Sequence, residues 1–484
     1  ANDCFLAVDA ESDDALQKAV QAGEAALGGG AAGGDGRRPG APAAAERPRS
    51  LTEALDALGE AANLAIVSVP GDYAALEAHK ALSSGLHVLL FSDNVPLDQE
   101  VELKERAEEA GLLVMGPGAG TAMLARTGLG FANVVSEVDT DGKSDDAATD
   151  PRPGVGVVAA AGTGAQEVAA LLDRGGARVT AIIGVGGRDL SEAVGGRMAR
   201  SGLRALHADP ATDAVLLVSK PPSEGVARTV LAEAGGLHRP SDGTAAKPAV
   251  ASLIGLTDPI PTPDGVTLAA TLEGGATRLL AALGLPPLDL DAGLQAAVTE
   301  AAAALAGERR LVRGLFSGGT LCYEALVILS GILGPVHSNT PIRKDWGLPA
   351  PDGAHVCLDL GEEEYTKGRP HPMIDPEARI EHLRQEGARP DVAVVLLDVV
   401  LGYGAHDNPA GQLAPVCAEI RADGRGPAVV AYVLGTGADP QGLEDQRAAL
   451  TAAGCIVPPT AGRAALAAAA LATRRPELVQ ESLS

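Results

Sequence analysis

Two glycine-rich turns in this chain have the composition of anion-binding sites. The segments 160–164 (AAGTG) and 317–320 (SGGT) each follow a short apolar run and begin a helical pattern. The first turn of a helix has unpaired backbone N–H groups and about half a positive charge, and glycine lets an anion approach them. The pair predicts a phosphate site built from two sides, by Gly162, Thr163, Gly164, Gly318, Gly319 and Thr320. The alternative is that both turns serve packing only.

Basic residues near these turns could complete such a site. Arg188, in the Gly186-Gly187-Arg188-Asp189 loop, is a candidate catalytic residue, although it could instead pair with Asp189 or cap a helix. Lys220 is a second candidate, because it follows the predicted strand Ala214–Val218 and ligands of open α/β sheets bind at the carboxyl ends of strands. An exposed lysine without a role is the alternative. Gly187 and Asp189 are predicted to bind substrate.

The GRPHP segment at 368–372 contains two more candidate catalytic residues, Arg369 and His371. Its two prolines restrict the backbone on either side of the histidine and so pre-orient the imidazole. His371 could accept a proton from an attacking amine or donate one to a phosphate; it could equally hold the loop by a hydrogen bond to Asp375. Arg369 is a candidate partner for a phosphate or a carboxylate.

Asp398 lies inside an apolar run and is followed by the Gly402-Tyr403-Gly404 turn. A carboxylate in a buried strand needs a charged partner, for which Arg369 is the candidate. Asp398, Gly402 and Gly404 are therefore predicted to bind substrate. Cys322 lies in the first turn of a helix, where the helix dipole would lower the pKa of a thiol, but we favour a small buried residue there over a catalytic thiol.

The candidate residues lie on two copies of one pattern: strand, glycine-rich turn, helix, polar loop and second buried strand. The first copy begins VGVVAAAGTGAQEVAALL and the second RGLFSGGTLCYEALVILSG. Their strands are continuous apolar runs, which indicates parallel strands covered on both faces. We therefore interpret the chain as containing a degenerate internal duplication.

A further α/β series precedes the first copy. It comprises a helix at 51–61, a strand Asn63–Val69, a helix from about Asp72, a strand His87–Ser92, a helix near 98–110 and a strand Leu112–Met115. Linkers are predicted at 28–50, Asp139–Pro151 and 236–248, a bridging helix at about 290–308, and a last strand and helix at Ala428–Leu434 and 462–473. This order predicts the α/β class with doubly wound parallel sheets.

Composition argues against several functional classes. The chain has 484 residues, a formal net charge of −25 and no cluster of Lys and Arg, so a nucleic-acid partner is not expected. No apolar stretch reaches the roughly 18 residues that cross a membrane, and no signal peptide is visible, although the chain begins without Met. The five cysteines lack CxxC spacing, which favours reduced thiols over disulfides or a metal site. We expect a cytoplasmic protein.

Several of these segments resemble the FdrA family, which is built on the α-subunit plan of succinyl-CoA synthetase. The matching strings are FSDNV at 91–95, GFANVV at 130–135, GGRDLSE at 186–192, VSKPP at 218–222, GRPHPMIDP at 368–376 and LLDVVLGYGA at 396–405. The resemblance implies a Rossmann-like CoA-binding-type domain at 1–138, with a flexible insert at 28–50. Two flavodoxin-like succinyl-CoA-synthetase-type domains would follow at 152–285 and 309–484. It also matches the two glycine-rich turns to the paired "power helices" that stabilise a phosphate between subunits.

Three working parts of succinyl-CoA synthetase are missing here. The family's phosphohistidine motif would follow a strand matching Lys247–Gly255, but this chain continues Leu256-Thr257-Asp258-Pro259-Ile260. The remaining length leaves no room for an ATP-grasp domain. The first βα turn, Val8–Ser12, contains no glycine, which weakens the expectation of CoA as a cofactor. ATP-driven thioester formation by this chain alone is therefore not the favoured reaction.

The resemblance implies a carbamoyltransferase instead. FdrA-type proteins are associated with oxamate carbamoyltransferase in purine (allantoin) degradation, in which carbamoyl phosphate and oxamate interconvert with oxalurate and phosphate. We expect a component of such an enzyme, acting on carbamoyl phosphate and a small anionic amide, as a homo-oligomer or with companion subunits. The alternatives are an acyl-CoA ligase or transferase that works with a partner chain, and a non-catalytic scaffold. Gly118-Ala119 replaces the Asp-Cys pair common in relatives, so the acceptor could differ.

Overall fold

The computed structural model describes residues 48, 50–58, 62–135, 150–236, 247–257, 260–291, 293–422 and 424–483. The chain divides into two compact units, Ala1–Ala61 and Ala62–Ser484. In the first unit the described helix is α2 (Leu51–Leu58), close to its predicted range. The predictions for Val8–Ser12, for most of 28–50, for the linkers at 139–149 and 237–246 and for Asp258-Pro259 lie outside the described residues. All that follows concerns the second unit.

The first sheet of this unit is small and parallel, in the order β1-β2-β3. Its elements are β1 (Leu64–Val67), α3 (Gly71–Ser83), β2 (His87–Leu90), α4 (Leu97–Ala110) and β3 (Val114–Met115). Each lies within or close to a predicted range, because the apolar strands alternate with helices whose alanine and leucine side chains are buried. The strands are shorter than predicted.

The second sheet has seven strands in the order β10-β9-β8-β6-β7-β4-β5. The five strands from β6 onward are parallel, whereas β4 and β5 form an antiparallel hairpin that joins the edge of β7. Its strands are β4 (Thr121–Leu124), β5 (Thr127–Gly130), β6 (Gly154–Ala159), β7 (Arg178–Gly184), β8 (Ala214–Ser219), β9 (Ala249–Leu253) and β10 (Val266–Ala269). Its helices are α5 (Gly162–Arg174), α6 (Arg197–Ala208), α7 (Glu224–Gly236) and α8 (Leu272–Ala282); the next helix in the chain, α9 (Leu294–Ala304), packs against α15 (Ala461–Thr473) of the third sheet.

The hairpin is a difference from the sequence prediction, which contained parallel strands only. In its turn, Ala125 and Arg126 have φ values of +46° and +66°. Hairpin turns with positive φ usually contain glycine or asparagine, and neither residue occupies these two positions. The hairpin comes from the stretch assigned to the first predicted domain, yet it pairs with the second sheet.

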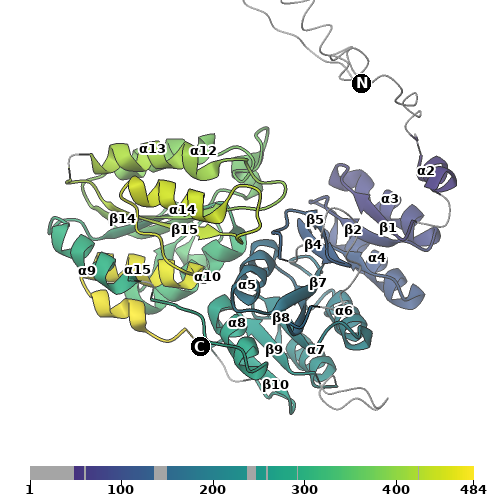
Figure 1. Cartoon of the computed structure of the whole chain (residues 1–484). Coiled ribbons are helices and arrows are strands. Elements are labelled where there is room, and N and C mark those ends of the chain that lie inside the picture. The colour runs from purple at the N-terminus through teal and green to yellow at the C-terminus, as the bar shows by residue number, and fades with distance from the viewer. Residues whose placement is uncertain are drawn as a thin grey trace, which may run out of the picture. The chain divides into compact units, whose positions relative to one another are not determined.

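The third sheet is parallel, in the order β12-β13-β11-β14-β15. Its strands are β11 (Leu311–Phe316), β12 (Val336–His337), β13 (His355–Asp359), β14 (Val392–Val400) and β15 (Ala428–Leu434). Its helices are α10 (Gly319–Leu333), η2 (Lys344–Trp346), α11 (Glu363–Thr366), α12 (Glu377–Gly387), α13 (Pro409–Arg421), α14 (Leu443–Ala452), α15 (Ala461–Thr473) and η3 (Pro476–Gln480). Figure 1 shows α12 and α13 on one face of this sheet and α9, α10 and α15 on the other.

The duplication is visible in the strand order. In the second sheet β7, β6, β8, β9 and β10 follow one another, and in the third sheet β13, β11, β14 and β15 repeat the first four positions. This is the order 2-1-3-4-5 of flavodoxin-like sheets. In each sheet the chain order reverses beside the strand that precedes a glycine-rich turn, β6 in one and β11 in the other. Both halves are therefore mixed α/β structures with parallel strands, and no helix among the described residues is both long enough and apolar enough to cross a membrane.

A single apolar core runs between the second and third sheets through α5, α8, α10 and α15. The alanine-rich helix α15 lies inside it, with its side chains from Ala464 to Leu471 at most 2 % exposed. Small side chains let this helix approach the β14 and β15 strands and α10 closely. Two carboxyl groups, those of Glu167 on α5 and Glu324 on α10, are buried in the same core.

These carboxyl groups predict a pH-dependent stability. Burial raises the pKa of Glu324 to about 8, while its Oε1 accepts the N–H of Leu272 at 2.6 Å. Between the ordinary pKa of 4.5 and about 8, the folded protein keeps a proton that the unfolded chain has lost, so the free energy of unfolding falls as pH rises. We expect Glu324→Gln, which has no proton to lose, to be more stable than the wild type by about 3–5 kcal/mol at pH 8.5.

Urea unfolding at pH 4 and pH 8.5 measures this difference, which should nearly vanish at the lower pH. Glu444→Gln is the control, because the Glu444 side chain is 80 % exposed. Equal stability of Glu324→Gln and the wild type at both pH values would show that Glu324 is ionised in the fold.

Candidate active site

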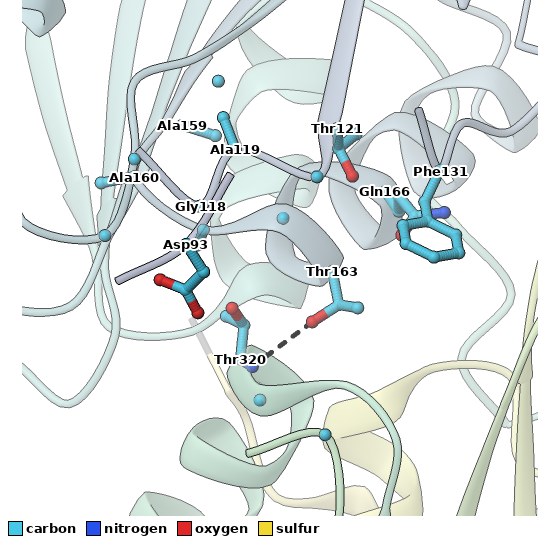
Figure 2. A pocket seen from close by; sticks show the side chains of 18 of the residues that line it. Asp93, Gly118, Ala119, Thr121, Phe131, Ala159, Ala160, Thr163, Gln166 and Thr320 are labelled. Atoms are coloured by element: carbon cyan, nitrogen blue, oxygen red, sulfur yellow. Dashed lines mark hydrogen bonds between the residues drawn. The ribbon is translucent and has the colours of Figure 1, made fainter. Parts of the chain in front are cut away.

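The two glycine-rich turns meet in the folded protein. Helices α5 and α10 start directly after β6 and β11, and the backbone N–H of Thr320 donates to Oγ1 of Thr163 at 3.3 Å (Figure 2). A Cβ at Gly164 would lie 2.8 Å from Cγ2 of Thr320, and one at Gly318 would lie 2.8 Å from Cγ2 of Thr163. These two glycines therefore allow the helix starts to touch, which no other residue type would permit.

A cavity of about 450 Å³ opens at this contact. Of the six predicted phosphate-binding residues, Gly162, Thr163, Gly319 and Thr320 line it, whereas Gly164 and Gly318 form the helix contact behind it. The other lining residues are Phe91, Asp93, Gly118, Ala119, Gly120, Thr121, Phe131, Ala159, Ala160, Ala161, Gln166, Gly184, Gly186, Gly187, Lys220, Ser317, Asp359, Gly361, Glu362, His371 and Met373. All three sheets or their connecting loops thus contribute to one cavity.

Two of the four candidate catalytic residues, Lys220 and His371, line this cavity, as does the predicted substrate-binding residue Gly187. Lys220 follows β8, and its Nζ lies 4.6 Å from the centroid of the Tyr323 ring. Among the described residues that line the cavity, Lys220 is the lone lysine or arginine. An anion held there would face this ammonium and the positive ends of α5 and α10.

The His371 ring is held in one orientation. Its Nδ1 accepts the backbone N–H of Met373 at 3.3 Å, and its ring centroid lies 5.8 Å from that of Phe131. The alternative hydrogen bond from the ring to Asp375 is replaced by these contacts, since Asp375 bonds the carbonyl of His371 through its backbone N–H and uses its side chain on Glu377. Burial lowers the pKa of His371, so the ring is neutral near pH 7 and carries its proton on Nε2.

Arg188 and Asp189 do not line the cavity. Arg188 donates to the carbonyl of Val95 at 2.7 Å and pairs with Glu100 at 2.8 Å, outside the cavity. Asp189 is fully buried, pairs with Lys104 at 3.0 Å and accepts the N–H groups of Met198 and Ala199 at the start of α6. This loop therefore joins α4 to α6, because a buried carboxylate is stable only with such partners.

Asp398 has a structural role and a different partner from the predicted one. Its carboxylate pairs with Arg379, on α12, at 3.0 Å, and both side chains are at most 3 % exposed. Its two oxygens also accept the N–H groups of Ser317 and Gly318 at 2.8 Å each, so Asp398 positions the turn at the start of α10 from behind. Arg369 points outward instead: its side chain is 59 % exposed and lies 3.7 Å from Glu381.

The Gly402-Tyr403-Gly404 turn packs against the 130–133 segment rather than lining the cavity. Gly402 has a φ of +107°, and a Cβ there would lie 2.5 Å from the carbonyl oxygen of Ala132. Gly404 has a φ of +83°, with Phe131 3.0 Å from its Cβ position. Both glycines thus accommodate a neighbouring chain segment, and neither lines the cavity.

Cys322 is a small buried residue, as favoured above. Burial raises the pKa of its thiol far above the usual range, which overrides any effect of the helix dipole. The thiol is also fully buried and does not line the cavity, which argues against a thiolate nucleophile at this position.

Sequence reasoning missed several cavity residues, above all Asp359, Glu362, Asp93 and Gln166. Asp359 ends the buried strand β13, and burial raises the pKa of its carboxyl to about 7. The signal that could have revealed it is an acidic residue at the end of an apolar run, immediately before Leu-Gly. The exposed glutamates at 362–364 hid this signal, because they give the segment the composition of a polar loop.

Comparison with known proteins shows to which family this chain belongs. Residues 315–471 match the family model for CoA-ligase. The protein YahF of Escherichia coli strain K12, itself uncharacterized, is 38 % identical over 403 residues, which is 82 % of this chain and 74 % of YahF. The chain belongs to the YahF family. The segment 315–471 is similar to CoA-ligases, and the resemblance of the chain to FdrA stays a prediction.

Two solved structures share low similarity with this member of the YahF family. The dinucleotide-forming acetyl-coenzyme A synthetase 1 of Candidatus Korarchaeum cryptofilum, in its apo form, is 16 % identical with a TM-score of 0.32, over 87 % of this chain and 85 % of that one. ATP citrate lyase from Methanothrix soehngenii, in complex with citrate and coenzyme A, is 18 % identical with a TM-score of 0.32, over 48 % and 36 %. At these TM-scores the likeness bears on neither the site nor the activity.

Proposed function

We propose that this chain is a carbamoyltransferase component of the FdrA type. It would transfer a carbamoyl group between carbamoyl phosphate and the nitrogen of a small anionic amide such as oxamate. The observation that carries the proposal is the contact between the starts of α5 and α10 at the cavity wall, with Lys220 lining the same cavity. Two helix starts and an ammonium group are suited to a phosphate dianion.

The chemistry requires little beyond such a site. The acceptor nitrogen attacks the carbonyl carbon of carbamoyl phosphate, a C–N bond forms, the C–O bond to phosphate breaks and one proton leaves the nitrogen. Donors aimed at the departing phosphate stabilise the charge that it gains, and alignment of the two reactants supplies much of the remaining acceleration. The neutral His371, with its proton on Nε2, could donate a hydrogen bond to the phosphate or to the carbonyl oxygen. No covalent intermediate on the protein is needed.

The anionic acceptor would use the same positive groups. Arg369, the predicted partner for a phosphate or a carboxylate, lies outside the cavity, so Lys220 and the first N–H groups of α5 and α10 would serve both anions. Asp93 and Glu362 line the cavity as well and would restrict the acceptor to one small carboxylate.

A second candidate function is supported by the CoA-ligase match at 315–471. The chain could transfer an acyl group between an acyl phosphate and CoA, with a partner chain that phosphorylates the acid. The turn that would seat the CoA phosphates, Val8–Ser12, lies outside the described residues.

Phosphorolysis tests the proposal directly. The purified chain, alone and with the proteins encoded beside it, is incubated with oxalurate and inorganic phosphate, and carbamoyl phosphate is measured. We expect carbamoyl phosphate to form; formation of acyl-CoA from acyl phosphate and CoA would favour the second function, and no turnover in any combination would favour a non-catalytic scaffold.

A glycine variant provides the matched structural test. In Gly318→Ala the new methyl group would lie 2.8 Å from Thr163 and should push the starts of α5 and α10 apart. We expect phosphate to bind at least about tenfold more weakly, since the gap would cost more than about 1.4 kcal/mol of anion binding. Gly331→Ala is the control, because a Cβ on that α10 residue meets nothing within 4 Å. Calorimetry with inorganic phosphate measures both, and equal affinities would contradict the two-helix site.

A further inference from the structure

Asp359 is a cavity carboxyl group to which the proposed function assigns no role. It ends β13 and is 4 % exposed. The side-chain amide of Asn339 fixes its backbone, because Nδ2 donates to the carbonyl oxygen of Asp359 and Oδ1 accepts its N–H, both at 2.9 Å. Because these two hydrogen bonds hold its backbone, the Asp359 side chain has a defined position in the cavity wall.

That position is the start of α10. A Cβ at Gly319 would lie 2.5 Å from Oδ2 of Asp359, so the carboxyl group occupies the space that any other residue at 319 would fill. Its Oδ1 accepts the N–H of Gly361 at 3.0 Å. A phosphate bound at the start of α10 would therefore have the Asp359 carboxyl group as a direct neighbour. Two negative groups this close are compatible only if one of them carries a proton.

The charges around Asp359 keep that proton available near neutral pH. Burial is the main cause of its raised pKa of about 7; Glu362 and Asp398 raise the pKa further, and Lys220 lowers it. His371, neutral as described, lines the same cavity, whereas the thiol of Cys322 on α10 is fully buried outside it and has a raised pKa. A group that gains and loses a proton near pH 7 can act as both base and acid in one reaction.

His371 lies on the same side of the cavity but is a hydrogen-bond donor there, not a proton acceptor. A Cβ at Gly361 would lie 2.7 Å from Nε2 of His371 and 3.2 Å from Oδ1 of Asp359, so both groups border the same glycine. Because Nδ1 of His371 is taken by the N–H of Met373, the neutral ring presents an N–H at Nε2 and is a donor. The acceptor for a proton must be another group.

We propose that Asp359 is the proton-transfer residue of this site. Its protonated carboxyl group gives its proton to the phosphate oxygen released as the C–O bond breaks, and takes up the proton that the acceptor nitrogen loses as the C–N bond forms. The products are then the N-carbamoyl compound and hydrogen phosphate, with Asp359 again protonated. This inference rests on the proposed carbamoyl transfer.

Phosphate binding gives a readout that does not require turnover. If Asp359 borders the bound phosphate, raising the pH ionises it and weakens binding, while Asp359→Asn, which stays neutral, lacks this contribution. We expect the phosphate affinity of the wild type to fall by about tenfold or more, relative to Asp359→Asn, between pH 6 and pH 8.5. Asp375→Asn, an exposed carboxylate outside the cavity, is the matched control and should follow the wild type.

Calorimetry with inorganic phosphate in buffers of different ionisation enthalpy measures both affinity and proton uptake. The wild type and Asp375→Asn should take up more protons per phosphate at pH 7.5 than Asp359→Asn does. Carboxyl ¹³C NMR of aspartate-labelled wild type provides a measurement independent of the variant's folding: one resonance should titrate near neutral pH and shift upward in pKa when phosphate is added. No such resonance, or identical pH dependence in all three proteins, would overturn the role of Asp359.

Kinetics separate this inference from the proposed function. With carbamoyl phosphate as donor and ammonia or hydroxylamine as the acceptor, Asp359→Asn should lower kcat by about 10²-fold for ammonia at unchanged KM for carbamoyl phosphate. The loss should be smaller for hydroxylamine, whose nitrogen gives up its proton more easily. Equal kcat in variant and wild type would overturn the role of Asp359 and leave the carbamoyltransferase proposal intact. A wild type that neither binds phosphate nor transfers a carbamoyl group would overturn both.

Discussion

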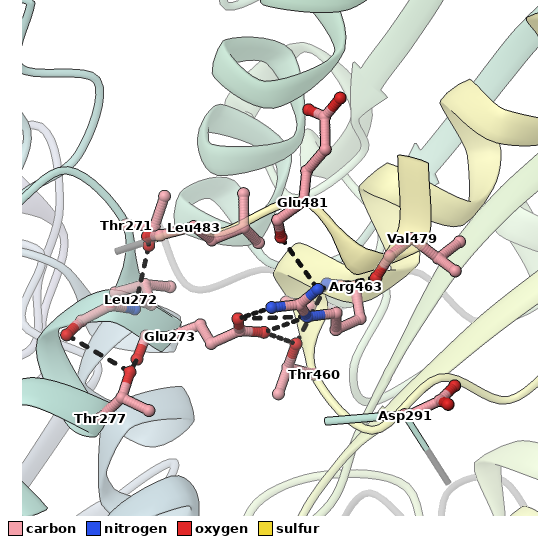
Figure 3. A network of polar contacts seen from close by, with 12 residues as sticks. Thr271, Leu272, Glu273, Thr277, Asp291, Thr460, Arg463, Val479, Glu481 and Leu483 are labelled. Carbon is pink, nitrogen blue, oxygen red and sulfur yellow. Dashed lines mark hydrogen bonds and ion pairs between the residues drawn. The ribbon is translucent and has the colours of Figure 1, made fainter. Parts of the chain in front are cut away.

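Replacing Arg463 by methionine is expected to lower the free energy of unfolding by about 3–5 kcal/mol, because it leaves the buried Glu273 carboxylate without its counter-ion. Arg463, on α15, reaches Glu273, on α8, through Nη2 at 2.6 Å and Nε at 3.1 Å (Figure 3). The two side chains are 8 % and 3 % exposed. The pair therefore joins the second and third sheets where water cannot replace a lost partner.

The same arginine also holds the last described segment of the chain. Its Nη1 donates to the carbonyl oxygens of Val479 at 2.7 Å and Glu481 at 3.0 Å, and Thr460 donates to Glu273 at 2.6 Å. Methionine keeps most of the apolar volume but none of these donors, so the loss should be electrostatic rather than a packing defect.

Urea unfolding at pH 7 measures the effect, and two variants control it. Arg475→Met removes an exposed arginine whose partner Glu477 is also exposed, and should change stability by less than about 1 kcal/mol. Adding Glu273→Gln to Arg463→Met should recover a large part of the loss, because it removes the unpaired charge. A single variant as stable as the wild type would contradict a stabilising role for this ion pair.

Replacing Lys220 by methionine is expected to reduce turnover of carbamoyl phosphate by about 10²–10³-fold, the usual cost of removing one charge-stabilising donor. Lys220 is the lone lysine or arginine among the described cavity-lining residues, and the described residues of α5 and α10 that line the cavity carry no charged side chain. Its removal should weaken phosphate binding and slow the chemical step together, because the departing phosphate gains charge in the transition state.

Arg369→Ala is the matched control for Lys220→Met. Both remove one positive charge from a predicted catalytic position, but the Arg369 side chain is 59 % exposed and outside the cavity. We expect Arg369→Ala to retain activity within about twofold, as surface substitutions away from a site usually do. Steady-state kinetics of both variants decide the matter: full activity in Lys220→Met with loss in Arg369→Ala would place the substrate outside the cavity described above.

The elements of the fold were largely predictable, because burial of continuous apolar runs dictates where parallel strands lie. The predicted strand Ala428–Leu434 is β15 itself, and the bridging and last helices lie within one to four residues of α9 and α15. The β4–β5 hairpin was not predictable, since Ala125 and Arg126 adopt positive φ values only because pairing with β7 compensates the strain.

Partners of charged residues could not be predicted at all. Asp398 was expected to pair with Arg369 but pairs with Arg379, which lies ten residues later in the chain, on α12. The composition of this segment does not distinguish the two arginines as partners for Asp398. Arg369 lies in the loop before α12, whereas Arg379 lies on α12, which packs against β14 and brings its side chain to Asp398; this follows from helix packing rather than from any local pattern.

Glycine content and apolar periodicity are local properties, so the two glycine-rich helix starts, each after a buried strand, could be recognised in the amino-acid sequence. The contact of these starts at Thr163 and Thr320, and the cavity that Lys220, His371 and Asp359 border together, are visible in the folded protein alone. The reason is physical: which polar groups meet depends on how the sheets pack, and packing is set by the whole buried surface rather than by the polar residues themselves.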